Sequence, residues 1–127
     1  MVHLDYRDTR PIYVQILDGL KEQIATGVLL PGDRLPSVRE LAATLAINPN
    51  TIQRSYKLLE IDGWIATVPG KGCFVSRNQK ALQQEIDRWY AALDEAAENL
   101  LSLGITTEQI LAHLKQPERI QMPPLKP

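Results

Sequence analysis

The sequence predicts a mostly helical α+β fold, and three observations point to it. Two short helices with clear N-terminal capping signals follow each other closely between residues 37 and 62. A glycine-tipped hairpin comes directly after them, and a long helix with a heptad pattern follows the hairpin. Two closely linked helices followed by a hairpin are the layout of a winged helix-turn-helix. We therefore expect an N-terminal winged helix-turn-helix and a C-terminal two-helix segment.

Composition limits the class of protein. A chain of 127 residues, 44% of them hydrophobic, can form one domain with an appendage and bury a modest core. The single cysteine, Cys73, excludes an intramolecular disulfide and fits a reducing cytoplasm. The polar N-terminus does not resemble a signal peptide, and no apolar run approaches the roughly 20 residues of a membrane span. We expect a cytoplasmic protein without membrane contact.

The first helix is expected to start at Pro11, whose fixed φ angle and missing N–H suit the first helical position. Apolar residues then recur every four positions and form one stripe, at Ile12, Ile16, Leu20 and Ile24. Gly27 ends this helix, and a Pro-Gly pair at 31–32 marks the turn that follows.

The next two helices carry the clearest start signals. Ser37 and Glu40 form a capping box at the start of the second helix. Asn48 caps the third helix, with Pro49 at its first position. Because only two residues, 46 and 47, lie between these helices, the helices must cross sharply, as in a helix-turn-helix.

A hairpin is predicted after the third helix, which Gly63 stops near residue 62. Two β-prone runs, 64–68 and 73–76, flank a turn of proline and glycine. The turn residues Gly70, Lys71 and Gly72 would let the backbone approach a DNA minor groove while the lysine adds positive charge. The alternative is a plain hairpin turn.

A long helix is predicted over residues 79–103. Its apolar residues alternate by four and three, which makes an a/d seam of Leu82, Ile86, Trp89, Leu93, Ala96, Leu100 and Leu103. The seam is either an intramolecular core or a dimer interface. Because the remaining chain is too short to cover it, we expect a homodimer.

A second, shorter C-terminal helix starts at Thr106, which forms a capping box with Gln109, and folds back on the long helix. The proline-rich tail after residue 116 is expected to be disordered. The expected domains are therefore a winged helix-turn-helix at 1–77, a helical dimerisation segment at 78–116 and a disordered tail at 117–127.

Polar side chains on the third helix are the main functional candidates. Five of them point away from its buried stripe: Asn50, Thr51, Gln53, Arg54 and Lys57. The first turns of this helix enter the major groove in the motif, where Asn and Gln can pair with adenine and Arg with guanine. The alternative is an ordinary solvated helix face, but the capped helix before it and the hairpin after it favour DNA.

Residues at the start of the second helix would support binding to the DNA backbone. Arg39 could reach a base or a phosphate, whereas Arg34 and Ser37 are placed for phosphates near a positive helix N-terminus. The alternative for Arg34 is a local salt bridge with Asp33 or Glu40.

The total charge gives no support to DNA binding, because the formal net charge is -1 and DNA-binding domains are usually basic. The DNA hypothesis therefore depends on where the charges lie.

Other chemistry has little support in the sequence. One cysteine and two distant histidines, His3 and His113, do not make a zinc site. No nucleophile elbow or phosphate-binding glycine loop is present. We expect no metal, no cofactor and no enzymatic activity. Cys73 is expected to be a packed thiol, with a redox sensor as the alternative.

Several stretches together form a specific pattern. They are Pro11-Ile12-Tyr13-Val14-Gln15-Ile16, Gly27, the run 31–41 (PGDRLPSVREL), Asn48-Pro49-Asn50-Thr51, Leu59-Glu60, Gly63 and Gly70-Lys71-Gly72. Through them, residues 11–77 resemble the GntR family of bacterial regulators, and its short YtrA-type branch in particular. The brief helical C-terminus resembles the YtrA-type dimerisation segment.

The resemblance implies a winged-helix dimer, usually a repressor, that often controls transporter genes and its own operon. By position in the motif, it implies DNA contacts from Arg34, Ser37, Arg39, Asn50, Thr51, Gln53 and Arg54, with Gly70 at the wing tip. Two residues depart from the pattern. Cys73 stands where Thr is usual, and Gln53 stands where many longer relatives carry a basic residue, so their operators do not transfer to this chain.

The sequence thus predicts a homodimeric, sequence-specific repressor that binds a palindromic operator in double-stranded DNA near its own and transporter genes. The alternative is a winged-helix module that binds another protein without DNA; it would not need Arg39, Gln53, Arg54 and Lys71 on one face. A cavity between the C-terminal helices and the winged domain could admit a small-molecule effector, which the sequence does not identify. The operator sequence and the regulated genes also stay open.

Overall fold

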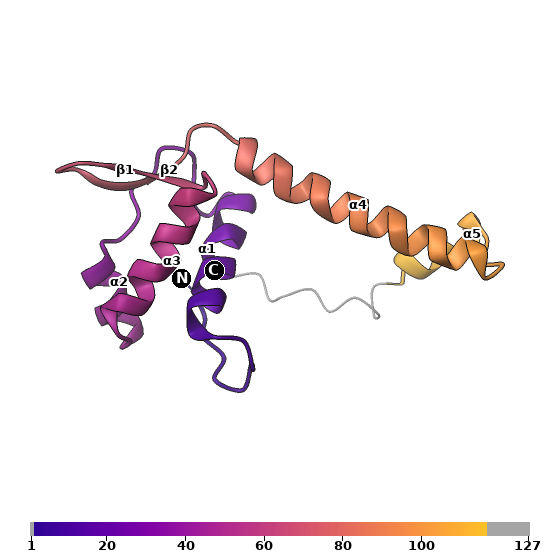
Figure 1. The fold of residues 1–127 in the computed structure, drawn as a ribbon, viewed down its shortest axis with the longest axis horizontal. Helices are drawn as coiled ribbons and strands as arrows, with labels where there is room; N and C mark the ends of the chain where they lie inside the picture. Colours follow the sequence, from indigo (N-terminus) through magenta and orange to yellow (C-terminus); the bar gives the residue numbers. More distant parts are fainter. Residues whose placement is uncertain (1, 117–127) are drawn as a thin grey trace. The chain divides into compact units, whose positions relative to one another are not determined.

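The computed structural model describes residues 2–116, which form two compact units (Figure 1). The first unit ends at Gln83 and the second begins at Gln84. The elements in chain order are α1 (Ile12–Ala25), α2 (Val38–Leu45), α3 (Pro49–Ile61), β1 (Ile65–Val68), β2 (Gly72–Val75), α4 (Lys80–Ser102) and α5 (Thr107–Leu114). The predicted mostly helical α+β class is confirmed. The tail at 117–127, expected to be disordered, lies outside the described residues.

The first unit packs three helices and a hairpin around one core, with α3 between α1 and α2 (Figure 1). Ile16, Leu35, Ile52 and Leu59 are almost completely buried at its centre. Their apolar spacing on the helices produces this core, because residues four apart face the same side. None of the helices within 2–116 is long and apolar enough to cross a bilayer.

The N-terminal segment is part of this unit, which the sequence pattern did not indicate. Val2 is buried and packs against Gly19 on α1, where a Cβ would lie only 2.9 Å from the Val2 Cγ1. The Gln15 side chain accepts from the Asp5 backbone N–H at 2.9 Å and donates to the Asp5 carbonyl oxygen at 3.1 Å. The buried Gln15 side chain thus satisfies both the N–H and the carbonyl group of Asp5, as a neighbouring β-strand would.

The helix starts follow the predicted capping residues closely. Ser37 Oγ accepts from the Glu40 backbone N–H at 3.0 Å, and Asn48 Oδ1 accepts from the Asn50 N–H at 2.8 Å. Only one half of the predicted Ser37–Glu40 capping box forms, because the Ser37 side chain caps the helix while the Glu40 side chain does not bond back to the Ser37 N–H. The prediction for Pro11 was wrong by one residue. Its ψ angle of 149° is extended, so it is the N-cap residue and α1 proper begins after it.

The turn between α2 and α3 depends on one residue in a rare conformation. Ala46 has a φ angle of 56°, in the left-handed region that alanine adopts at a cost. The Ile47 N–H then donates back to the Ala42 carbonyl oxygen at 3.1 Å. This closes the end of α2 and turns the chain directly into α3, as the two-residue connection predicted.

The hairpin β1–β2, called the wing below, pairs antiparallel from Ile65 opposite Val75 to Val68 opposite Gly72. The Lys71 N–H donates to the Val68 carbonyl oxygen at 2.9 Å, and Gly70 takes a φ angle of 74° after Pro69. Proline followed by a glycine with positive φ is the pattern of a type II turn.

A third extended segment, residues 33–35, pairs with β2 and was not predicted. The Leu35 N–H donates to the Cys73 carbonyl oxygen, and the Val75 N–H donates to that of Asp33, both at 2.8 Å. The loop that leads into α2 is therefore hydrogen-bonded to the wing.

The division between the units falls within α4, later than the expected boundary at residue 77. The reason is that Ala81 and Leu82, in the first turn of α4, pack against the core of the first unit. In the second unit, both halves of the predicted capping box between Thr106 and Gln109 are present at the start of α5.

Candidate nucleic-acid interface

The polar face of α3 lies on the surface of the first unit. The helix buries Ile52, Ser55, Tyr56 and Leu59 against its neighbours. The opposite side exposes Asn50, Gln53, Arg54 and Lys57, while Thr51 is half-buried. The structure thus places the five sequence-predicted residues of α3 on or beside one solvent-facing surface.

Two buried hydroxyls fix the orientation of α3. Ser55 Oγ donates to the Tyr13 carbonyl oxygen on α1 at 2.9 Å. The Tyr56 hydroxyl donates to the Pro36 carbonyl oxygen at 2.6 Å. Burial raises the pKa of the Tyr56 phenol well above its ordinary value, so the hydroxyl keeps its proton for this bond. The exposed face of α3 is therefore held relative to both α1 and the loop before α2.

Arg54 leans toward α1 and stacks on an aromatic ring. Its Cζ lies 3.7 Å from the centroid of the Tyr13 ring, a cation–π contact. Tyr13 was not among the predicted site residues. The two residues lie far apart in sequence and on different helices, so no local spacing could have indicated the pair.

Arg34 bonds to the wing. Its Nε donates to the Lys71 carbonyl oxygen at 3.3 Å. Neither predicted acidic partner, Asp33 or Glu40, forms an ion pair with it among the described residues. Asp33 instead accepts from the Leu30 N–H at 2.9 Å. Arg34 remains exposed, so its terminal nitrogens are available to a ligand.

The start of α2 and the wing tip complete the predicted set. Arg39 is exposed in the first turn of α2, and Ser37 is half-buried with its Oγ engaged in the cap. At the wing tip Gly70 and Lys71 are exposed, and a Cβ at Gly70 would meet no atom within 4 Å. Gly72 lies beneath them, against Arg34.

A groove of about 430 Å³ separates α3 from the wing. It is lined by Val38, Gln53, Tyr56, Lys57, Glu60, Thr67 and Cys73. The Glu60 carboxylate accepts a hydrogen bond from the Thr67 hydroxyl, which links α3 to β1. Cys73 Sγ lies 3.3 Å from the Thr67 oxygen, so the thiol is packed in this groove. The acidic Glu60 was not predicted as part of this surface.

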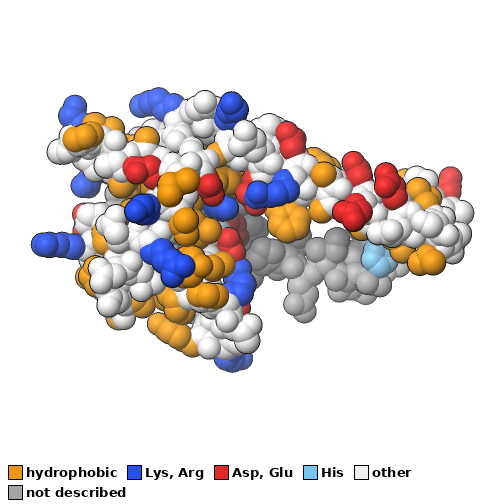
Figure 2. All heavy atoms as spheres, viewed as in Figure 1, with side chains coloured by type: hydrophobic (Ala, Val, Ile, Leu, Met, Phe, Trp, Pro, Cys, Tyr) orange, Lys and Arg blue, Asp and Glu red, His pale blue; other side chains and the backbone are white. Residues whose placement is uncertain are grey.

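Charge is unevenly distributed between the units. Lys and Arg side chains surround the first unit in the view of Figure 2, whereas Asp and Glu side chains gather along α4. The unit that carries α3 therefore has a small excess of basic side chains, with ten Lys and Arg against eight Asp and Glu in residues 1–83. Among the described residues, no group of three or more His, Cys, Asp or Glu side chains could hold a metal ion.

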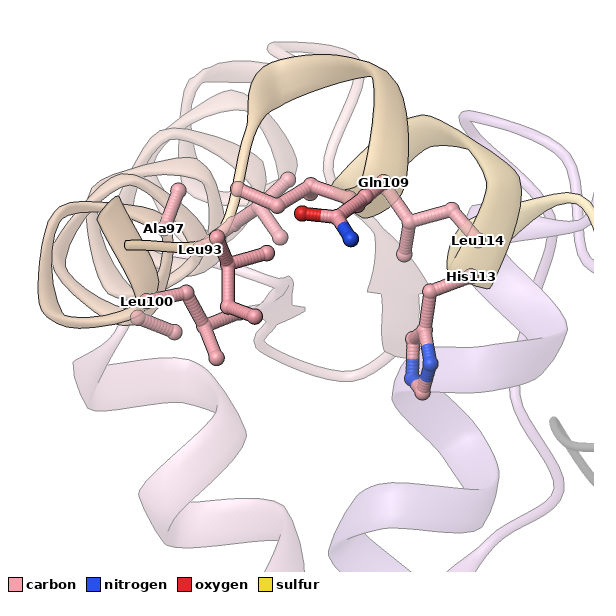
Figure 3. A pocket seen from close by; sticks show the side chains of 9 residues that line it. Leu93, Ala97, Leu100, Gln109, His113 and Leu114 are labelled. Carbon is pink, nitrogen blue, oxygen red and sulfur yellow. The ribbon is translucent and has the colours of Figure 1, made fainter. Parts of the chain in front are cut away.

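The second unit exposes most of the predicted dimer seam. Trp89 is 66% exposed and Leu103 79%, and Ile86, Leu93, Ala96 and Leu100 are also exposed. Leu82 differs, because it packs against the core of the first unit. Between α4 and α5 lies an apolar groove of about 470 Å³, where leucines of α4 face Gln109 and His113 of α5 (Figure 3).

A helix-turn-helix with an exposed polar recognition helix and an adjacent glycine-tipped wing defines a DNA-binding transcription regulator. The model of the family described as "Bacterial regulatory proteins, gntR family" matches residues 12–75. The chain belongs to the GntR family.

Similarity to known proteins supports the assignment to the GntR family. The chain is 48% identical over 80 residues to the HTH-type transcriptional repressor YtrA of Bacillus subtilis, a match that covers 63% of this chain and 62% of YtrA. A GntR family transcriptional regulator from Listeria monocytogenes has a similar structure, with a TM-score of 0.72 and 36% identity over 93% of this chain and all of that one. The DNA-binding domain of AraR, solved in complex with operator ORR3, matches 58% of this chain and 89% of that domain with a TM-score of 0.52 and 27% identity.

Proposed function

We propose that this GntR-family regulator is a homodimeric repressor that binds a palindromic operator near its own and transporter genes. The observation that carries the proposal is the exposed polar face of α3 beside the wing. The structural similarity to the AraR domain, whose crystals contain operator DNA, supports the same use of this surface. The similarity to the repressor YtrA supports repression.

In this proposal α3 enters the major groove and the wing lies over the neighbouring minor groove. Asn50, Gln53 and Arg54 face base edges, because their amide and guanidinium groups match adenine and guanine. The phosphate contacts come from Arg34, Ser37, Arg39, Thr51, Lys57 and Lys71. The groove beside α3 leaves room for the phosphate strand that runs between the major and minor grooves.

In this proposal the second unit forms the dimer interface. The apolar stripe of α4 packs against a second copy of this chain. Ile86, Trp89, Leu93 and Leu100 form one apolar stripe in the spacing of a helix that packs against another helix. Helical spacing places Asp87, Asp94 and Glu98 on the other side of α4, and Figure 2 shows acidic side chains along this helix. A two-fold dimer presents two recognition helices about 34 Å apart, which requires a palindromic operator.

The proposal contains no catalytic step, because the family and its similar members are regulators. Its site of action is DNA in the cytoplasm. Repression would result from occlusion of a promoter by the bound dimer. A small-molecule effector fits this scheme but is not assigned to a site.

Selection of bound fragments from the source genome tests the proposal, at about 0.15 M salt so that nonspecific binding is weak. Wild type should enrich a palindrome, and Arg54→Ala, which removes a side chain proposed to read a base, should lose that enrichment. Arg7→Ala removes the same charge from a side chain that is 95% exposed in the N-terminal segment, and it should behave as wild type. Weak, salt-sensitive binding that all three proteins share would contradict specific recognition and favour a protein-interaction module.

A further inference from the structure

The contact between Tyr13 and Arg54 joins the N-terminal helix to the recognition helix. The Arg54 Cζ lies 3.7 Å from the Tyr13 ring centroid, a distance at which the guanidinium and the ring are in van der Waals contact. Arg54 has no ion-pair partner among the described residues, so the ring is the group that holds its side chain.

The position of the ring is itself fixed by α3. Ser55, the residue after Arg54, donates its hydroxyl to the Tyr13 carbonyl oxygen at 2.9 Å and is fully buried. The backbone of Tyr13 is therefore held against the same turn of α3 that carries Arg54. Tyr13 is half-buried while Arg54 is exposed, so the ring is a firm support and the guanidinium is the accessible group.

Stacking restrains a guanidinium without consuming its donors. The N–H groups of arginine lie in the plane of the guanidinium, whereas the ring contacts its face. An arginine held in this way has lost much of its side-chain entropy before a ligand arrives, and it can still form two parallel hydrogen bonds. Guanine offers the matching pair of acceptors, O6 and N7, in the major groove.

We propose that Tyr13 is a positioning residue for DNA recognition, which holds Arg54 in the orientation that reads a guanine. The proposal rests on the proposed function, and it adds a residue of α1 that does not itself contact a base. It predicts that the identity of residue 13 influences which operator the protein prefers.

The first measurement needs no DNA. In the ¹H–¹⁵N spectrum of the free full-length protein, the Arg54 Nε–H should be shifted by the ring current of Tyr13. The shift should persist in Tyr13→Phe, which keeps the ring, and disappear in Tyr13→Leu. An Arg54 signal that is the same in wild type and Tyr13→Leu would overturn the proposal, whatever DNA the protein binds.

The second measurement uses the DNA fragment that wild type selects, with binding followed by fluorescence anisotropy. Tyr13→Leu should weaken binding by about three- to tenfold and relax the preference for guanine at one base pair per half-site, in line with a partly exposed cation–π contact. Tyr13→Phe should bind within about twofold of wild type, since it keeps the ring. Thermal unfolding confirms that each variant is folded.

A double-mutant cycle separates positioning from a structural role. In an Arg54→Ala background, Tyr13→Leu should have no further effect on affinity. A loss that persists in that background, or a loss that is equal for every base sequence, would show that Tyr13 acts on the fold alone and would overturn the proposal. If wild type selects no sequence, the proposed function fails and the role of Tyr13 in DNA recognition fails with it, while the spectrum still reports whether the stack exists.

Discussion

Arg34 and Lys71 connect the loop before α2 to the tip of the wing, through the Arg34 Nε and the Lys71 carbonyl oxygen at 3.3 Å. The guanidinium passes beside Gly72, where a Cβ would lie 3.0 Å from the same Nε. Glycine at this position therefore allows the arginine to reach the wing.

Gly72→Ala should disturb this connection and weaken DNA binding. The Gly72 φ angle of 119° is unfavourable for alanine, and the added methyl group meets the Arg34 side chain. We expect a loss of about 1–3 kcal/mol in the free energy of unfolding and weaker operator binding, measured by urea unfolding and anisotropy. Gly70→Ala is the matched control, because its φ angle is also positive but its Cβ meets no atom. Because Gly70 lies at the proposed DNA contact, this control applies to stability alone, and equal losses in the free energy of unfolding in both variants would show that the Arg34 contact is unimportant.

Ala46→Gly should stabilise the protein. Alanine has a left-handed conformation here, with a φ angle of 56°, and glycine adopts that conformation without the steric cost. The gain should be about 0.5–1 kcal/mol, since the relief of strain exceeds the extra entropy of the unfolded chain. Ala43→Gly, an exposed substitution within α2, should instead destabilise by about 1 kcal/mol. Thermal unfolding of both variants tests whether Ala46→Gly raises the stability and Ala43→Gly lowers it.

Glu60→Gln should strengthen nonspecific DNA binding. The carboxylate lines the groove where the proposal places a phosphate strand, and it repels that strand. Glutamine can still accept from the Thr67 hydroxyl, so the link between α3 and β1 is kept. Anisotropy titrations over a range of salt concentrations should give a salt dependence steeper by up to about one unit. Unchanged affinity at low salt would mean that DNA does not pass this groove.

Tyr56→Phe should destabilise the fold by about 1–2 kcal/mol near neutral pH, because the buried Pro36 carbonyl oxygen loses its donor. Burial raises the pKa of the Tyr56 phenol above the value of about 10 that it has when unfolded. Its contribution to the free energy of unfolding is therefore complete below about pH 10 and is lost as the pH rises toward the folded pKa.

Urea unfolding between pH 8 and 11 tests this linkage. The stability of wild type should fall more steeply above pH 10 than that of Tyr56→Phe, because phenylalanine has no proton to lose. Identical alkaline slopes would contradict the role given to the buried phenol.

Leu93→Lys should convert the proposed homodimer into monomers. The leucine lies on the exposed stripe of α4, and a lysine there would place a charge in the proposed interface. Ala91→Lys adds the same charge on the opposite side of α4 and should leave the dimer intact. Sedimentation velocity separates the two states. A Leu93→Lys protein that sediments as wild type would exclude this stripe as the interface.

Helix positions could be predicted from the sequence because their signals are local. The caps at Ser37, Asn48 and Thr106 lie within three residues of the groups they bond, so short patterns identify them. The burial of Ile16 and Ile52 likewise follows from periodicity.

The remaining features depend on residues far apart in the chain. The stack of Tyr13 on Arg54, the contact of Val2 with Gly19 and the pairing of segment 33–35 with β2 each join separate elements. No spacing rule connects such residues before the chain is folded. The surface of α3 was therefore predicted as a set of side chains, whereas the contacts that orient them were not.

The two anchors of α3, Ser55 on Tyr13 and Tyr56 on Pro36, lie on the buried side of the helix. Asn50, Gln53 and Lys57 point to solvent and form no part of the core. These three positions can therefore be exchanged at little cost in stability, since surface substitutions away from such anchors usually change it by less than about 0.5 kcal/mol. Gene duplication followed by changes at these positions would give a regulator with a new operator on the same fold. The architecture thus separates what keeps the protein folded from what evolution can alter.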